Sequence, residues 1–222
     1  MVSTSDVEWG YRLFLCREPD HAFVANHAKA NRTLSDLRDA FTSSVEFQTY
    51  IRGGDKPKVF RCVDCNARPF YANTKHLDAV EDYILCRYAP DASRNVTSGL
   101  RTGDTFVDIG AGIGWFSVLA AEQVGTSGRI YAFEPDRANF EALQKTIEAR
   151  SLGGIISCVR AAVSDRNSFL ALPNGERVPT IALDRYDLQG RVSMLRIGPV
   201  KDSKIIIDGS TSLIARDHPH IF

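Results

Sequence analysis

The sequence predicts an α/β fold, in which helices cover a mostly parallel sheet, with a small helical segment in front of it. Three observations lead to this prediction. From residue 59 onward, short runs rich in β-branched and aromatic residues alternate with stretches of helical periodicity. Such alternation is typical of parallel strands that are joined by helices. Residues 6–52 show helical periodicity alone, and one predicted strand leads directly into a glycine-rich turn.

The strands and helices of the predicted sheet follow one another along the second half of the chain. Four runs have the composition of strands: Thr105–Ile109, Arg129–Phe133, 155–159 and Val192–Ile197. Three stretches have helical periodicity: Trp115–Val124, 136–150 and roughly 203–216. Because 44% of the 222 residues are hydrophobic, the chain has enough apolar material for a sizeable core.

The N-terminal segment, residues 6–52, is predicted to be helical. A break at Pro19 and Asp20 is a usual place for a helix to stop. Thr33 stands three residues before Asp36, which is a weak capping-box signal for a new helix. Four apolar residues follow at helical spacing: Leu34, Leu37, Ala40 and Phe41.

Residues 53–58, which contain a glycine pair and a Lys-Pro-Lys run, are typical of a linker. We therefore expect two domains, a helical module over 1–55 and an α/β domain over 56–222. Residues 11–20 and 44–47 resemble a small helical module of unknown function that occurs beside bacterial glycan-modifying enzymes, although Cys16 replaces its usual glycine. The alternative is a helical appendage that only packs against the main domain.

Charge, cysteine content and hydrophobic runs argue against several classes of protein. Lysine plus arginine equals aspartate plus glutamate, at 27 each, and nucleic-acid binding needs a basic face. The N-terminus lacks a secretory signal, and no apolar run is long enough to cross a bilayer. Five cysteines, an odd number, do not suggest a disulfide framework. We expect a cytoplasmic protein with neither a membrane nor a nucleic-acid partner.

Cysteine and histidine residues offer one possible metal site. Cys62 and Cys65 have zinc-knuckle spacing, and His76 and Cys86 are candidates for the other two ligands. Structural zinc sites usually combine two tight ligand pairs, whereas this second pair is widely spaced. We therefore expect no bound metal, with zinc as the alternative.

The strongest chemical signal is the turn that follows the strand 105–109. Gly110, Gly112 and Gly114 form a G-x-G-x-G pattern before a predicted helix. Glycine allows a sharp turn and a close approach of the backbone to a ligand. The helix N-terminus offers N–H groups and a positive dipole end, which favour an anionic group. Asp108 ends the strand and is a candidate acceptor for a ligand amine or hydroxyl.

Glu134, which ends the next strand and precedes Pro135, makes this signal more specific. An acidic residue at that place reaches the two hydroxyls of a ribose. The site therefore suits a nucleoside with a ribose diol and a charged amino-acid tail, as in S-adenosylmethionine. A nicotinamide cofactor fits poorly, because dinucleotide sites have the spacing G-x-G-x-x-G. In the structural alternative, the glycines only close a turn and Glu134 caps a helix.

Three motifs lie in and after this region: DIGAGIGWFS at 108–117, GRIYAFEPD at 128–136 and AAVSD at 161–165. They resemble the FkbM family of S-adenosylmethionine-dependent methyltransferases, which typically reads D-I-G-A-N-x-G-x-x-S, G-x-V-x-A-F-E-P and A-V-S-D. The likeness runs from about Val59 to the C-terminus and is strong over 103–165. It implies a Rossmann-like class I methyltransferase sheet and methylation of a hydroxyl on a small-molecule or glycan acceptor.

The resemblance also implies roles for residues of the turn and of the neighbouring strand ends. These are Asp108, Gly110, Ala111 and Gly112 at the methionine end, Gly114 in the same turn, Glu134 with Pro135 at the ribose, and Ala162 near the adenine. It assigns no catalytic base.

The chain departs from the family pattern at the reacting end of the site, where methyl transfer would take place. The chain has RIGPVKDS at 196–203 where the family has K-I-D-V-E-G-A-E, so Gly198 and Val200 replace acidic residues. It also has Tyr-Ala-Pro at 88–90 where the family often has Y-E-P. Methyl transfer to oxygen needs an aligned nucleophile and a base or metal that takes its proton. The alternative is therefore a catalytically degenerate protein that kept the fold as a binding or interaction module.

The C-terminal residues 218–222 look like the start of the family's fifth strand, so the resemblance implies a sheet that is shortened at its C-terminus. An unfinished sheet exposes an edge, and the apolar stretch 205–214 precedes it. Pairing of two copies would cover this edge. We therefore expect a homodimer whose interface includes residues 190–222.

Overall fold

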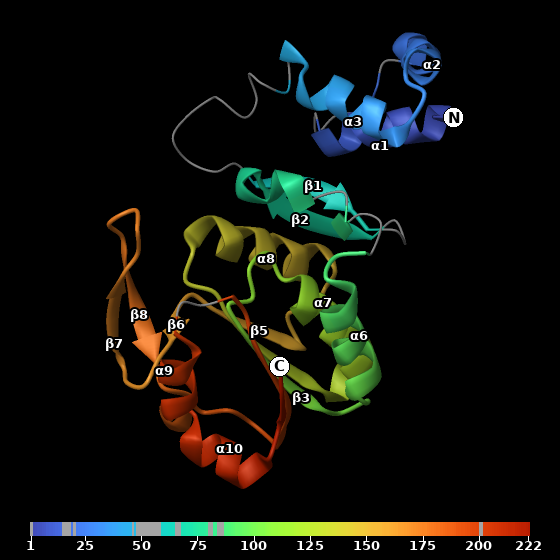
Figure 1. The fold of residues 1–222 in the computed structure, drawn as a ribbon. Coiled ribbons are helices and arrows are strands. Elements are labelled where there is room, and N and C mark those ends of the chain that lie inside the picture. Colours follow the sequence, from blue (N-terminus) through green and yellow to red (C-terminus); the bar gives the residue numbers. More distant parts are fainter. Residues whose placement is uncertain are drawn as a thin grey trace.

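The computed structural model describes residues 2–14, 19, 21–45, 47, 59–64, 68–79, 82–83, 87–199 and 202–222. A parallel sheet of five strands forms the centre of its larger part (Figure 1), in the order β10-β9-β3-β4-β5. These strands are β3 (Thr105–Ile109), β4 (Arg129–Phe133), β5 (Ile156–Val159), β9 (Val192–Ile197) and β10 (His220–Ile221). The predicted Rossmann-like α/β architecture is thus confirmed.

Both faces of the sheet are buried, because side chains of one strand alternate between two hydrophobic cores. Phe106 and Ile130 point to the core shared with one group of helices, whereas Val107 and Tyr131 point to the opposite core. The first group of helices comprises α6 (Pro90–Gly99), α7 (Trp115–Val124) and α8 (Arg137–Ala149). The opposite core is covered by η3 (Leu183–Arg185), α9 (Ser203–Asp208) and α10 (Thr211–Asp217).

Most of the predicted sheet elements agree with the structure to within a residue or two. The strands β3, β4 and β9 and the helix α7 have the predicted bounds. Helix α8 begins at Arg137 because Asp136 is its N-cap, whose side chain accepts a hydrogen bond from the Asn139 N–H at 3.1 Å. The short strand β10 lies within residues 218–222, where the start of a strand is expected, and it pairs with β9.

The prediction of one helix over 203–216 is wrong, because the chain forms the two helices α9 and α10 there. The break lies at Gly209, which packs against the backbone of Ser164, where a Cβ atom would overlap the carbonyl oxygen. Glycine is common just past the end of a helix. The packing partner is far away in the sequence, so the helical periodicity alone gives no sign of it.

A second sheet, of three strands, lies beside the first and was not predicted (Figure 1). It contains β6 (Ala162–Val163), β7 (Ser168–Ala171) and β8 (Arg177–Ile181), in the order β6-β8-β7. Strand β8 has the alternating burial of a half-buried strand, but all four residues of β7 are exposed. An exposed strand lacks the alternation of apolar and polar residues on which prediction depends.

The N-terminal helices form a separate hydrophobic cluster, which includes Val7, Tyr11, Leu37 and Phe41. They are α1 (Thr4–Phe14), α2 (His21–Ala30) and α3 (Leu34–Thr42), so Pro19 falls between two helices as predicted.

The capping box at the start of α3 is confirmed. The Thr33 hydroxyl accepts a hydrogen bond from the Asp36 N–H at 3.1 Å, and the Asp36 carboxylate accepts one from the Thr33 N–H at 2.9 Å. The predicted apolar face is narrower than expected, because Leu34 and Ala40 are exposed. The division at residue 55 stays a prediction, since Cys16 and the linker 53–58 lie outside the described residues.

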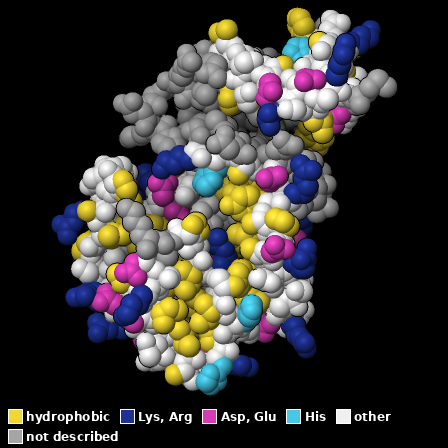
Figure 2. Space-filling model, in the orientation of Figure 1, with side chains coloured by type: hydrophobic (Ala, Val, Ile, Leu, Met, Phe, Trp, Pro, Cys, Tyr) yellow, Lys and Arg dark blue, Asp and Glu magenta, His cyan; other side chains and the backbone are white. Residues whose placement is uncertain are grey.

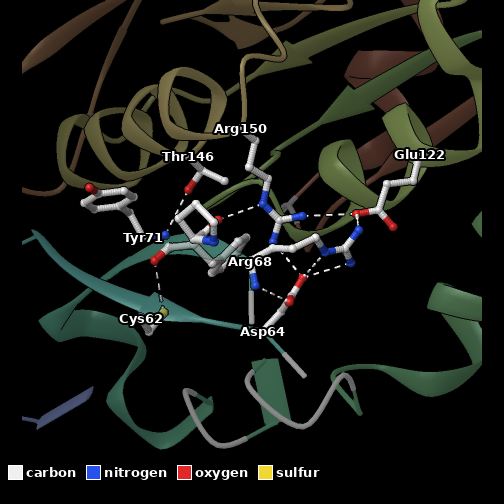
Figure 3. A network of polar contacts seen from close by, with 9 residues as sticks. Cys62, Asp64, Arg68, Tyr71, Glu122, Thr146 and Arg150 are labelled. Atoms are coloured by element: carbon white, nitrogen blue, oxygen red, sulfur yellow. Dashed lines mark hydrogen bonds and ion pairs between the residues drawn. The ribbon is translucent and has the colours of Figure 1, made fainter. Parts of the chain in front are cut away.

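A hairpin of β1 (Val59–Val63) and β2 (Pro69–Asn73) lies against α8 (Figure 1). A network of ion pairs holds it there (Figure 3). Asp64, just after β1, accepts a hydrogen bond from Arg150 Nη2 at 2.7 Å and also pairs with Arg68. Arg150 donates to the Pro69 carbonyl at 2.7 Å, and Glu122 of α7 pairs with both arginines. The network therefore ties the hairpin to two helices of the main sheet.

Hydrophobic side chains gather over the C-terminal part of the chain on the face that Figure 2 shows. In the same part of the chain, Ile205 and Ile221 are exposed to 39% and 36%. The expected self-association through residues 190–222 stays a prediction, which light scattering of the purified chain would test. Among the helices of the described residues, none is both long and apolar enough to cross a membrane.

Candidate functional site

A cavity of about 560 Å³ opens beside the ends of β3, β4 and β9. Parallel sheets bind ligands at the carboxyl ends of their strands, at the point where the strand order reverses. Here β4 and β5 lie on one side of β3, whereas β9 and β10 lie on the other. The cavity therefore occupies the place where this architecture favours a ligand.

The glycine turn after β3 forms one wall of the cavity. Gly110 and Gly112 have positive φ angles of 68° and 59°, which glycine adopts without strain. The N–H groups of Gly110 and Ala111 donate to the Phe133 carbonyl at 2.9 and 3.0 Å, so the turn is fixed against β4. A Cβ atom on Gly112 would meet no atom within 4 Å. The backbone thus leaves open space on the cavity side, where a ligand can approach closely.

Glu134 lines the same cavity from the carboxyl end of β4, and only 5% of the residue is exposed. Its carboxylate accepts hydrogen bonds from the Gly112 N–H at 2.7 Å and from the Asp136 N–H at 2.9 Å. Burial raises the pKa of Glu134, although these hydrogen bonds act in the opposite direction. The side chain is therefore held in one position by the turn that it faces.

Asn139 connects Glu134 to the hairpin segment. Its Nδ2 lies 3.4 Å from Glu134 Oε1, and its Oδ1 accepts hydrogen bonds from Asn73 Nδ2 and His76 Nε2, both at 2.9 Å. His76, on η1 (Thr74–Ala79), and Asn139 both line the cavity. These contacts give no signal in the sequence, because Asn139 lies more than sixty positions from Asn73 and His76 and the three residues form no motif.

An aromatic wall lies on another side of the cavity. It consists of Tyr83, Tyr88, Trp115 and Phe116, which all line the cavity. The rings of Tyr83 and Tyr88 have centroids 4.2 Å apart, and those of Tyr83 and Trp115 are 5.5 Å apart. Burial and a hydrogen bond with Tyr88 raise the pKa of Tyr83. Tyr83 is therefore a neutral phenol under physiological conditions.

Six of the eight predicted cofactor residues line the cavity: Gly110, Ala111, Gly112, Glu134, Pro135 and Ala162. The other two lie behind it. Asp108 is completely buried and accepts hydrogen bonds from Ser117 Oγ at 2.6 Å and from Arg196 Nη1 at 2.7 Å. Gly114 packs against Leu143, leaving no room for a Cβ atom. These two residues support the turn rather than line the cavity.

Arg196, near the end of β9, places a positively charged side chain in the cavity wall. Its guanidinium group pairs with Asp108 and lies 4.0 Å from the ring centroid of Phe116. Nearby Gly198 is buried, and a Cβ atom there would lie 2.9 Å from the Ile109 carbonyl oxygen. The present backbone therefore has no space for an acidic side chain at Gly198. Val200, the second replaced position, lies outside the described residues.

The zinc alternative is not tested by the structure. Cys65 and Cys86 lie outside the described residues. Within the described part of the chain, no group of three or more His, Cys, Asp or Glu side chains is arranged to hold a metal ion. His76 instead pairs with Asn139, and Cys62 lies 3.3 Å from the Phe70 carbonyl oxygen. The expected absence of metal remains a prediction.

Comparison with known proteins gives no family-model match and no match among curated sequences. Several solved structures are similar in part. The methyltransferase FkbM from Methylobacillus flagellatus has 13% identity and a TM-score of 0.47, with 68% of this chain and 44% of that chain covered. An S-adenosylmethionine-dependent O-methyltransferase from Thermotoga maritima has 18% identity and a TM-score of 0.41, with coverage of 78% and 54%.

Methanocaldococcus jannaschii Trm5 in complex with adenosine has 17% identity and a TM-score of 0.42. The similarity covers 72% of this chain and 40% of that chain. This chain thus spans less than two thirds of the length of each of these proteins. Because the identities and TM-scores are low, the similarity alone establishes no activity, substrate or cofactor. Another similar structure, from Clostridium thermocellum, is named as an rRNA methylase. The expected absence of a nucleic-acid partner stays a prediction.

Proposed function

We propose that the cavity binds S-adenosylmethionine and that the chain is a methyltransferase of the FkbM type, acting on a hydroxyl of a sugar or small metabolite. One observation carries the proposal. Glu134 and the glycine turn come from two neighbouring strands, are joined by a hydrogen bond of 2.7 Å, and line the same cavity. A carboxylate beside a closely approachable backbone suits a nucleoside with a ribose diol.

The cavity residues fit the parts of this cofactor. The Glu134 carboxylate would accept hydrogen bonds from the ribose hydroxyls, with Pro135 beside it, and Ala162 would lie near the adenine. When bound, S-adenosylmethionine supplies a methyl group on a positively charged sulfur. Tyr88 and Trp115 line the cavity, and aromatic rings of this kind attract cations. The chain's own residues therefore bind and orient the cofactor, while the acceptor and its base stay unassigned.

The second candidate function is a binding or interaction module that retains the fold without catalysis. It is favoured by the reacting end of the site, where Gly198 leaves no space for the acidic residue of the family pattern. The two functions differ in turnover. We expect transfer of labelled methyl groups from S-adenosylmethionine to a panel of sugars and hydroxylated metabolites. Cofactor binding without transfer to any acceptor would favour the binding module, whereas absence of cofactor binding would contradict the methyltransferase proposal.

The affinity for S-adenosylmethionine is expected to fall as the pH decreases through the pKa of Glu134. Ribose hydroxyls donate hydrogen bonds to the ionised carboxylate, so protonation removes acceptors that the ligand uses. Because burial raises this pKa above its ordinary value of 4.5, the loss begins at a higher pH than for an exposed glutamate. Calorimetric titrations at several pH values would measure it. A Glu134→Gln variant should show a flat profile, and an equally steep one would contradict the assignment.

A further inference from the structure

Arg196 lies at the end of the cavity that is next to Asp108 and the Gly110 carbonyl oxygen, which we call the inner end. Its Nη1 donates to Asp108 Oδ1 at 2.7 Å and lies 3.3 Å from the carbonyl oxygen of Gly110. The sequence makes the Asp108 carboxylate a candidate acceptor for a ligand amine or hydroxyl, but in the fold its Oδ1 is taken by Arg196. The second Asp108 oxygen accepts from Ser117 at 2.6 Å. Both Asp108 oxygens are therefore already engaged by side chains of the protein.

The same guanidinium group has hydrogen-bonding capacity left. Among the described residues, the only hydrogen bonds of its nitrogens come from Nη1, although the group carries five N–H donors. Arg196 lines the cavity with 11% of its side chain exposed, and the Phe116 ring 4.0 Å away fixes its position. A planar cation held in this way is suited to a carboxylate or a phosphate.

The other ionisable side chains of the cavity wall do not compete for Arg196. Besides the tyrosines, these are His76, Glu134 and Asp202. Glu134 is held by the backbone N–H groups of Gly112 and Asp136, and His76 by Asn139. Asp202 is exposed and caps α9, where it accepts from the Lys204 N–H at 3.0 Å. The remaining donors of Arg196 therefore have no anionic partner among these groups.

We propose that Arg196 forms an anion subsite at the inner end of the nucleoside cavity, which binds the anionic group on the 5′ substituent of an adenine nucleoside. In S-adenosylmethionine this group is the α-carboxylate. The ammonium group of the ligand cannot use Asp108 Oδ1 and the Gly110 carbonyl oxygen as acceptors, because Arg196 already contacts both. This inference rests on the proposed nucleoside binding. It adds that the protein recognises the carboxylate of the amino-acid tail and not its ammonium group. Arg196 is thus a residue that determines ligand specificity.

The test compares ligands that differ by one charged group, in calorimetric titrations of the whole chain. Decarboxylated S-adenosylmethionine keeps the nucleoside, the sulfonium and the ammonium group but lacks the carboxylate. We expect its affinity to be at least about 10-fold lower than that of S-adenosylmethionine, because the charge-assisted hydrogen bonds to the carboxylate are lost. Equal affinities would overturn the anion subsite while leaving the proposed function intact. If neither ligand nor adenosine binds, the proposed function itself fails.

A double variant links the effect to Arg196. Replacing Arg196 alone would leave the buried Asp108 charge without its partner and risk unfolding. The double variant Asp108→Asn with Arg196→Gln removes both charges, and a thermal melt checks that it folds. In this variant the two ligands should bind within about 3-fold of each other, since the charge-assisted bonds are absent. Arg94→Gln, an exposed control, should keep the full difference. An undiminished difference in the double variant would overturn the proposal.

Adenosine 5′-monophosphate distinguishes the two sources of the anion. If it binds more tightly than adenosine, and the double variant abolishes this gain, the subsite accepts phosphate as well. If it binds no better than adenosine while the carboxylate effect persists, the subsite is specific for the amino-acid tail. Both results support an anion subsite. The proposal would be overturned if S-adenosylmethionine bound as tightly as its decarboxylated form and adenosine 5′-monophosphate bound as tightly as adenosine.

Discussion

Replacing Glu134 with alanine is expected to weaken the binding of S-adenosylmethionine by about 1–3 kcal/mol, the cost of losing charge-assisted hydrogen bonds. The buried carboxylate faces the cavity and is held by the Gly112 N–H at 2.7 Å, so its position is fixed before a ligand arrives. A preformed acceptor of this kind loses little freedom when it binds a ribose diol. Isothermal calorimetry with the purified variant would measure the change.

Two further variants separate this effect from damage to the fold. Glu141→Ala removes a carboxylate from an exposed position of α8 and should leave the affinity unchanged. Glu134→Gln keeps the size of the side chain and one acceptor oxygen, so its affinity should lie between those of the wild type and the alanine variant. Binding by Glu134→Ala that is as tight as wild type would show that the ribose assignment is wrong.

Replacing Arg150 with methionine is expected to lower the free energy of unfolding by about 3 kcal/mol, because it removes one partner of a buried ion pair. The Arg150 and Asp64 side chains are only 7% and 3% exposed. The change also removes hydrogen bonds to the Pro69 carbonyl and to Glu122. Arg68 still pairs with Asp64 but is 36% exposed, so it replaces only part of the loss. Urea unfolding followed by circular dichroism would measure the difference.

The pH dependence of stability gives a second readout of this network. Burial acts to raise the pKa of Asp64, but hydrogen bonds from Arg68 and Arg150 outweigh it and hold the pKa below its ordinary value of 3.8. A depressed carboxylate pKa stabilises the fold above the unfolded value, and this contribution is lost as the pH falls through the folded value. In the Arg150→Met variant, the free energy of unfolding should therefore decrease less than in the wild type as the pH falls below about 5. An Arg94→Met control should match the wild type in the free energy of unfolding and in its pH dependence. If Arg94→Met and Arg150→Met lowered the free energy of unfolding equally, the role of the network would be contradicted.

The parts of the fold that sequence reasoning predicted are those with a local physical signal. Strand β3 is buried at every residue and is rich in β-branched and aromatic residues, and Thr33 and Asp36 form a capping box within four residues. The exposed strand β7 and the break at Gly209 depend on tertiary contacts, which leave no local pattern. Periodicity is informative only where one face of an element is buried and the other is not.

The site was predictable to the extent that its residues follow strand ends. The turn at Gly110 and Gly112 and the carboxylate of Glu134 lie where the motif spacing puts them, on one cavity. The engagement of Asp108 was not predictable, because its partner Arg196 lies 88 positions away. The aromatic wall was missed for the same reason. Tyr83 and Trp115 come from distant segments and meet only in the folded chain.

The measurement that tests the central claim most directly is a calorimetric titration of the chain with S-adenosylmethionine and with its demethylated product. The account predicts saturable binding of both ligands at one site per chain, competition between them, and a weaker binding of each by Glu134→Ala. A folded protein that binds neither ligand, or that binds both equally well without the Glu134 carboxylate, would contradict it.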